Sequence, residues 1–198
     1  MESKISAISK KYEIVLASGS PRRQELLSGL GIDYQVKTLP DLDESFPPEL
    51  TGEEIPLHIA QKKAEAYKPF IRPGQLIITA DTIVLLNGQV LGKPGNEAEA
   101  IEMLRDLSGK THQVITGVCL TASDWQRSFT ATTRVTFSAL TEEEILFYVE
   151  RYKPMDKAGA YGVQEWIGFI GVERIEGSFY NVMGLPIQKL YKELIKLV

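Results

Sequence analysis

Residues 16–27 place the hydroxyl groups of Ser18 and Ser20 close in sequence to the guanidinium groups of Arg22 and Arg23. Arginine binds phosphate through paired N–H donors, and hydroxyl groups can add hydrogen bonds to the same anion. The segment is therefore suited to holding a phosphate group. The alternative is that both arginines are surface charges or pair with carboxylates elsewhere in the chain.

The local structure expected for this segment favours the phosphate hypothesis. An apolar run over residues 14–17 predicts a buried strand. Ser20 and Pro21 then mark the N-cap and first position of a helix that ends near residues 30–31. The first turn of a helix carries partial positive charge on its free N–H groups, so two arginines are unfavourable there unless an anion binds. A strand-to-helix turn is also a common position for nucleotides.

Asp81 interrupts an otherwise apolar run over residues 76–86. A carboxylate buried in such a run is costly unless it is paired, hydrogen-bonded or bound to a metal ion. One interpretation is a turn or N-cap-like aspartate between two short strands, residues 77–79 and 83–86. The other is a metal ligand and general base at the end of a strand.

Lys63 and Lys93 are further candidate anion ligands. A helix is expected over residues 53–67, where Lys63 follows Ile55 and Ile59 at four-residue steps and so faces inward. Lys93 lies in a Gly-Lys-Pro-Gly segment, whose glycines and proline fix the backbone on either side of it. The alternatives are a Lys63 ammonium group that reaches water and a solvated turn lysine at Lys93.

Residues 155–164 form a second candidate binding loop. Asp156 and Lys157 precede a run of small residues that lets the backbone approach a ligand closely. Gln164 follows, with an amide that offers both donors and an acceptor to the edge of a base. The alternative is a tight structural loop that contains an Asp156–Lys157 pair.

The rest of the sequence predicts the elements that position these residues. Asn87-Gly88 predicts a type I′ hairpin, and Thr141 with Glu144 predicts a capping box. Strands alternate with helices but hairpins also occur, so we expect an α/β fold with a mixed sheet. The expected strands cover residues 34–37, 113–122, 127–138 and 167–175, an acidic loop covers 38–52, and the expected helices cover 96–109, 141–151 and 186–197.

The composition limits the class of protein. Of the 198 residues, 43% are hydrophobic and 24% are charged, which is typical of a globular protein with a buried core. The formal net charge of -4 argues against a general surface for nucleic acid or for an anionic membrane. The single cysteine, Cys119, permits no intramolecular disulfide, suits a reducing cytosol and is expected in the core.

Residues 1–12 are polar and lack the apolar segment of a signal peptide, and no run of the chain approaches the length of a membrane span. We therefore expect a polar, disordered leader over residues 1–12 and a single domain over residues 13–198.

A series of motifs in one order along the chain resembles the Maf family of nucleoside triphosphate pyrophosphatases. The resemblance runs from about residue 14 to residue 197 and so covers nearly the whole chain. The motifs are Ser18-Gly19-Ser20-Pro21-Arg22-Arg23, Ala80-Asp81-Thr82, Gly92-Lys93-Pro94, Leu107-Ser108-Gly109, residues 112–117, residues 156–164 and Gly184-Leu185-Pro186.

The resemblance implies an elongated, strongly twisted mixed sheet flanked by helices with a central cleft, as in inosine triphosphate pyrophosphatases. It also implies a cytoplasmic enzyme, commonly a homodimer, that cleaves a nucleoside triphosphate between its α and β phosphates. The products are the monophosphate and pyrophosphate. A divalent cation, Mg²⁺, Mn²⁺ or Co²⁺, is implied as the cofactor.

The resemblance further implies roles for single residues. Asp81 matches the proton acceptor, and Glu44 matches an acidic residue that helps to bind the metal. Arg22, Thr82 and Gln164 match the trio of the branch that acts on dTTP and UTP, whereas the 7-methyl-GTP branch has glutamine after the aspartate. The positions that match phosphate-binding residues are Ser18, Arg23, Lys63 and Lys93.

One departure from the family pattern lies beside the expected base pocket, where relatives usually have glycine after the glutamine and this chain has Glu165-Trp166. This departure bears on the fine preference for the base. Separately, two other functions stay open. One is a pyrophosphatase for the purine nucleotides ITP and XTP. The other is a regulator of cell division that senses nucleotides without hydrolysing them, although an intact Asp81 argues against it because pure binding needs no base.

Overall fold

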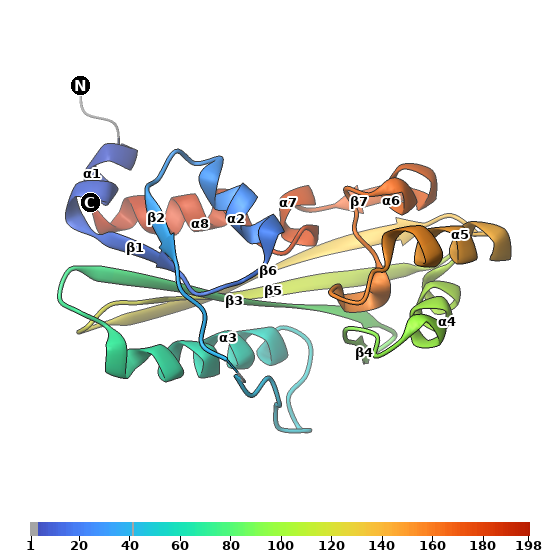
Figure 1. Ribbon diagram of the computed structural model, residues 1–198, viewed down its shortest axis with the longest axis horizontal. Coiled ribbons are helices and arrows are strands. Elements are labelled where there is room, and N and C mark those ends of the chain that lie inside the picture. Colours follow the sequence, from blue (N-terminus) through green and yellow to red (C-terminus); the bar gives the residue numbers. More distant parts are fainter. Residues whose placement is uncertain (1–3, 41) are drawn as a thin grey trace. The chain divides into compact units, whose positions relative to one another are not determined.

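The computed structural model describes residues 4–40 and 42–198. Within them a mixed sheet has the strand order β2-β1-β3-β5-β6-β7, and β4 pairs with β3 (Figure 1). The strands are β1 (Glu13–Leu16), β2 (Tyr34–Val36), β3 (Gln75–Leu86), β4 (Gln89–Leu91), β5 (Thr111–Thr121), β6 (Gln126–Phe137) and β7 (Val172–Glu176). The predicted α/β class with a mixed sheet is confirmed.

Helices α1 to α8 and three short 3₁₀ helices flank the strands in the described part of the chain. The α-helices are α1 (Lys4–Lys11), α2 (Pro21–Ser28), α3 (Glu54–Tyr67), α4 (Glu97–Leu107), α5 (Glu142–Tyr152), α6 (Trp166–Gly171), α7 (Phe179–Val182) and α8 (Ile187–Leu194). The 3₁₀ helices are η1 (Lys68–Phe70), η2 (Ala158–Ala160) and η3 (Ile195–Leu197). None of the helices in residues 4–40 and 42–198 has both the length and the apolar character to cross a membrane.

The chain divides into two compact units. Of the described residues, the first unit comprises 4–40, 42–81, 116–131 and 184–198, and the second comprises 82–115 and 132–183. Strands β3, β5 and β6 each contribute residues to both units. The single domain over residues 13–198 stays a prediction.

In the first unit, β1 lies parallel to both β2 and β3, with Ile14 opposite Tyr34 on one side and Leu76 on the other. Helix α3 covers one face of these strands, and α2 and α8 cover the other (Figure 1). Residues of α3 pack closely on β5, where a Cβ atom added to Gly117 would lie 2.3 Å from the carbonyl oxygen of Pro56. Cys119 is buried against α3, as expected.

In the second unit, β3 turns into β4 through Asn87 and Gly88, whose positive φ angles of 50° and 84° fit the predicted type I′ turn. Helix α4 packs against α5. The predicted capping box opens α5, because the Thr141 side chain accepts from the Glu144 N–H and the Glu144 carboxylate accepts from the Thr141 N–H.

Three sequence expectations are wrong in detail. Of the disordered leader expected over residues 1–12, residues 1–3 lie outside the described residues, and residues 4–11 form α1, in which Ile8 is fully buried. Residues 75–86 form one continuous strand, so the two short strands with a turn between them do not occur. Residues 167–175 begin as helix α6, because Gly168 N and Phe169 N both donate to Glu165 O, and a short apolar run does not distinguish strand from helix.

Candidate active site

An ion-pair cluster in the first unit joins Asp81 of β3 to α3 and to the acidic loop. Lys63 Nζ lies 2.8 Å from Asp81 Oδ1 and 2.8 Å from Glu44 Oε1. Lys63 and Asp81 are each only 8% exposed, so neither group is a solvated surface charge. The interpretation of Asp81 as a turn aspartate is excluded, and Lys63 faces inward as predicted.

The local structure explains why these side chains meet. Successive side chains of a strand alternate between its two faces. Thr79 donates its hydroxyl to Ala60 O of α3 at 2.7 Å, so Asp81, two residues later, also faces α3. Along α3, Lys63 follows the buried Ile59 by four residues and therefore lies on the same inward side.

Arg23 connects three segments of the first unit beside this cluster. Its Nε donates to Gly184 O at 2.8 Å, and its Nη1 donates to Ala80 O at 2.9 Å and to Ser18 Oγ at 3.4 Å. Burial lowers the pKa of the Arg23 guanidinium, while the nearby carboxylates of Asp81 and Glu44 act in the opposite direction. Arg23 is therefore a partly buried cation near both carboxylates, and its interpretation as a solvated surface charge is wrong.

The two serines have different local roles. Ser20 is the N-cap of α2, as predicted, and its hydroxyl accepts from Arg23 N at 3.5 Å. Ser18 Oγ accepts from Ser20 N at 3.3 Å and so lies inside the same turn. Arg22 is partly buried next to Arg23, whose pKa its charge helps to lower. The helix itself ends at Ser28 with Gly29 as its C-cap, slightly earlier than predicted.

The carboxylates of Asp81 and Glu44 are the groups of this site that could bind a divalent cation. Within residues 4–40 and 42–198, no group of three or more His, Cys, Asp or Glu side chains is arranged to hold a metal ion. Two hard carboxylate oxygens nevertheless approach one cation, the Lys63 ammonium. Mg²⁺ commonly takes one or two protein carboxylates and completes its ligands with phosphate and water, so this donor set fits such an ion.

The other predicted residues lie in the second unit. Thr82 follows Asp81 directly in β3, so its side chain leaves the strand on the other face. Lys93 lies between β4 and α4, in a loop whose Gly92 O accepts from Gly159 N at 3.0 Å. The Lys93 loop and the small-residue loop are thus bonded to each other, and Gln164 follows in the latter.

The family of this chain follows from a comparison of its sequence with models of known families. The sequence model of the family described as Maf-like protein matches residues 13–197. The chain belongs to the Maf family.

Three similar relatives carry the same functional name. A protein of Bacteroides thetaiotaomicron is 67% identical over 94% of this chain and 97% of its own length, and it is named dTTP/UTP pyrophosphatase. A protein of Phocaeicola vulgatus with the same name is 65% identical over 95% of this chain and 97% of its own length. A protein of Flavobacterium johnsoniae, also with this name, is 47% identical over 96% of this chain and 97% of its own length. Among solved structures, the Staphylococcus aureus Ham1 protein covers 91% of this chain and 99% of its own, with a TM-score of 0.50 and 22% identity, which supports the fold.

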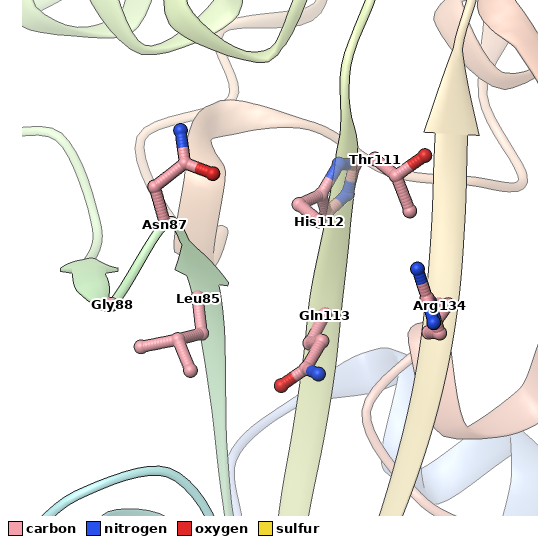
Figure 2. A pocket seen from close by; sticks show the side chains of 7 residues that line it. All are labelled: Leu85, Asn87, Gly88, Thr111, His112, Gln113 and Arg134. Atoms are coloured by element: carbon pink, nitrogen blue, oxygen red, sulfur yellow. The ribbon is translucent and has the colours of Figure 1, made fainter.

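A hollow of about 290 Å³ lies in the second unit of this Maf chain (Figure 2). Its described lining contains none of the candidate site residues. The lining residues are Leu85, Asn87, Gly88, Thr111, His112, Gln113 and Arg134. Figure 2 shows these side chains coming from three neighbouring strands and the hairpin turn, with His112 between Asn87 and Thr111.

His112 has a structural role beside this hollow. Its Nε2 lies 2.7 Å from the Tyr161 hydroxyl, and its ring packs edge-on against Phe137 and Tyr161. Burial lowers the pKa of His112 from 6.5 to about 4, so the ring is neutral at pH 7.

We expect the folded state to lose stability as the pH falls from 6 to 4. A histidine whose folded pKa is lowered binds protons more readily when unfolded, so its contribution is present above the unfolded pKa and is lost as the pH approaches the folded value. The difference in free energy of unfolding between wild type and His112→Gln should fall by about 2 kcal/mol from pH 6 to pH 4. Urea unfolding at several pH values measures it, and a constant difference would contradict the burial argument.

Proposed function

We propose that this Maf-family chain hydrolyses dTTP and UTP to the nucleoside monophosphate and pyrophosphate. The relatives named dTTP/UTP pyrophosphatase support the substrate class, because they match over nearly their whole length. The observation that carries the chemistry is the cluster in which Asp81, Glu44 and Lys63 meet beside Arg23. It combines a nearly buried carboxylate with the cations that a triphosphate requires.

The phosphates of the nucleotide are the proposed ligands of the basic side chains. A triphosphate carries about four negative charges, and its cleavage requires donors and cations where charge develops on the leaving group. Lys63 is shared by two carboxylates, so it can turn one of its N–H donors toward a phosphate and still keep an acidic partner. The proposed phosphate ligands are Ser18, Ser20, Arg23, Lys63 and Lys93.

Asp81 is the proposed general base. It accepts the proton of a water molecule as the water oxygen forms a bond to the α-phosphorus, and the bond from that phosphorus to the bridging oxygen breaks. The electron pair leaves with pyrophosphate, whose charge the basic side chains stabilise. Asp81 and Glu44 would also hold a divalent cation, Mg²⁺, Mn²⁺ or Co²⁺, which when bound supplies additional positive charge at the phosphates.

Arg22, Thr82 and Gln164 are the proposed determinants of the pyrimidine base. The Gln164 amide offers both a donor and an acceptor, which is what the edge of uracil or thymine requires. We also propose that the enzyme is a cytoplasmic homodimer, as the resemblance to the Maf family implies. The single buried cysteine suits the reducing cytoplasm.

The experiment is a nucleotide panel with separated products. UTP, dTTP, CTP, ITP and XTP are incubated with the protein and Mg²⁺, Mn²⁺ or Co²⁺, and pyrophosphate and orthophosphate are measured separately. We expect pyrophosphate and a monophosphate, with UTP and dTTP turned over fastest. Orthophosphate as the only inorganic product would contradict the cleavage position, and faster turnover of ITP would favour the purine alternative.

A further inference from the structure

An ion pair closes the loop that carries Gln164. Lys157 stands at the start of this loop and Glu165 at its end, and Lys157 Nζ lies 3.1 Å from Glu165 Oε1. The two side chains are only 8% and 20% exposed, so the pair is largely shielded from solvent. Between them Gly159 adopts a φ of 68°, which a larger residue rarely adopts. The loop is therefore fixed at both of its ends.

Tyr148 attaches the same carboxylate to α5. Its hydroxyl donates to Glu165 Oε2 and accepts from Gly162 N at 3.0 Å. Tyr148 is fully buried, and burial together with the Glu165 charge raises the pKa of its hydroxyl above the usual range. The hydroxyl thus stays protonated and remains a donor, so both oxygens of Glu165 have fixed partners.

Gln164 shares this packing but lacks a partner for its amide oxygen. A Cβ atom at Gly162 would lie 2.8 Å from the Glu165 carboxyl carbon and 3.1 Å from Gln164 Nε2, so both side chains pack over this glycine. Gln164 Oε1 is buried and has no hydrogen-bond partner among residues 4–40 and 42–198. A buried acceptor without a donor is costly, and a donor from a ligand would remove that cost.

We propose that Glu165 is a positioning residue for pyrimidine recognition, which holds the Gln164 amide so that its oxygen accepts the N3–H of uracil or thymine. This inference rests on the proposed function, because it assumes that Gln164 contacts the base. Uracil and thymine carry a donor at N3, whereas cytosine carries an acceptor there. An amide that cannot rotate therefore distinguishes them, while a mobile amide can turn to suit either base.

The test compares UTP with CTP in Glu165→Gln and Tyr148→Phe. Glu165→Gln keeps the shape of the side chain but removes one of the two carboxylate charges that pair with Lys157, since Asp156 Oδ1 stays 2.8 Å from Lys157 Nζ. We expect the ratio of kcat/KM for UTP to that for CTP to fall about tenfold in each variant, mainly through a higher KM for UTP. The kcat for UTP and the inhibition constant of inorganic tripolyphosphate, which has no base, should not change.

A double-mutant cycle separates positioning from a general structural effect. In a Gln164→Ala background, Glu165→Gln should cause no further loss of discrimination, because the amide that it positions is absent. Losses that simply add, or an equal fall in kcat for UTP and CTP, would overturn the proposal. Should Glu165→Gln fail to fold by circular dichroism, Tyr148→Phe in the same cycle decides in the same way.

Two matched control variants lie in α5, the helix that contains Tyr148. Glu150→Gln removes an exposed carboxylate of α5, and Tyr152→Phe removes a hydroxyl from the ring that stacks on Tyr148 at 5.1 Å. Both should keep the wild-type ratio of UTP to CTP, and loss of discrimination in either would overturn the assignment to Glu165. A wild type that releases no pyrophosphate from UTP contradicts the proposed function instead, so the two failures are distinguishable.

Discussion

Asp81→Asn is expected to lower kcat for UTP and dTTP by a factor of about 10² to 10⁴, because asparagine keeps the size of the side chain but cannot accept a proton. The fold should persist, since Lys63 retains Glu44 Oε1 at 2.8 Å as a charged partner. Nucleotide affinity should change far less than turnover. Pyrophosphate release measures kcat, and calorimetric titration with UTP measures the affinity.

Asp43→Asn is the matched control for this variant. Asp43 also pairs with a lysine of α3, Lys62, but its side chain is 64% exposed and lies outside the Asp81 cluster. Its kcat should equal that of the wild type. Unchanged turnover in Asp81→Asn would remove Asp81 from the role of base. A wild type that binds UTP but releases nothing would favour the nucleotide-sensing alternative.

Features set by neighbours in the chain could be predicted from the sequence. The Ser20 N-cap, the capping box at Thr141 and the turn at Asn87-Gly88 each depend on residues within a few positions of one another. The inward direction of Lys63 follows from helical periodicity for the same reason. Local patterns therefore place single candidate residues on the correct faces of their elements.

Pairings between distant segments could not be predicted in this way. Asp81 was expected either to break the strand or to bind a metal, because its partner Lys63 is 18 residues away and belongs to another element. Arg23 donates to Gly184, 161 residues further on, and no periodicity in the sequence indicates that contact. Nothing in the sequence indicated a role for Tyr148, because a buried tyrosine in an amphipathic helix is usually a core residue. Its role follows from the hydrogen bond between its hydroxyl and Glu165.

The resemblance to the Maf family predicted a site residue, Glu44, that the local patterns could not predict. The resemblance implied that Glu44 helps to bind a metal ion, although Glu44 lies outside the ordered motifs, and the structure brings Glu44 and Asp81 to the same ammonium group of Lys63. The roles of Thr82, Lys93 and Gln164 at the substrate stay predictions. The product assay and the double-mutant cycle test them directly.

Arg23→Met is expected to weaken both the fold and substrate binding. The substitution removes the Arg23 donors that contact Gly184 O at 2.8 Å and Ala80 O at 2.9 Å. Loss of the donor to a part-buried acceptor costs about 1–3 kcal/mol, so loss of both contacts should lower the free energy of unfolding by about 2–6 kcal/mol. Urea unfolding followed by circular dichroism measures this change. The KM for UTP should rise about 10- to 100-fold as a charged phosphate donor is lost.

Arg72→Met controls for the loss of an arginine as such. Arg72 Nη2 contacts Glu13 Oε1 at 3.2 Å with its side chain 66% exposed, and exposed pairs of this kind contribute little to stability. Its unfolding midpoint and KM should stay at the wild-type values. Arg23→Lys separates charge from geometry, because a lysine keeps the positive charge but cannot donate to Gly184, Ala80 and Ser18 in one planar fork. If Arg23→Lys recovered full stability, charge alone would account for the effect and the forked contacts would not.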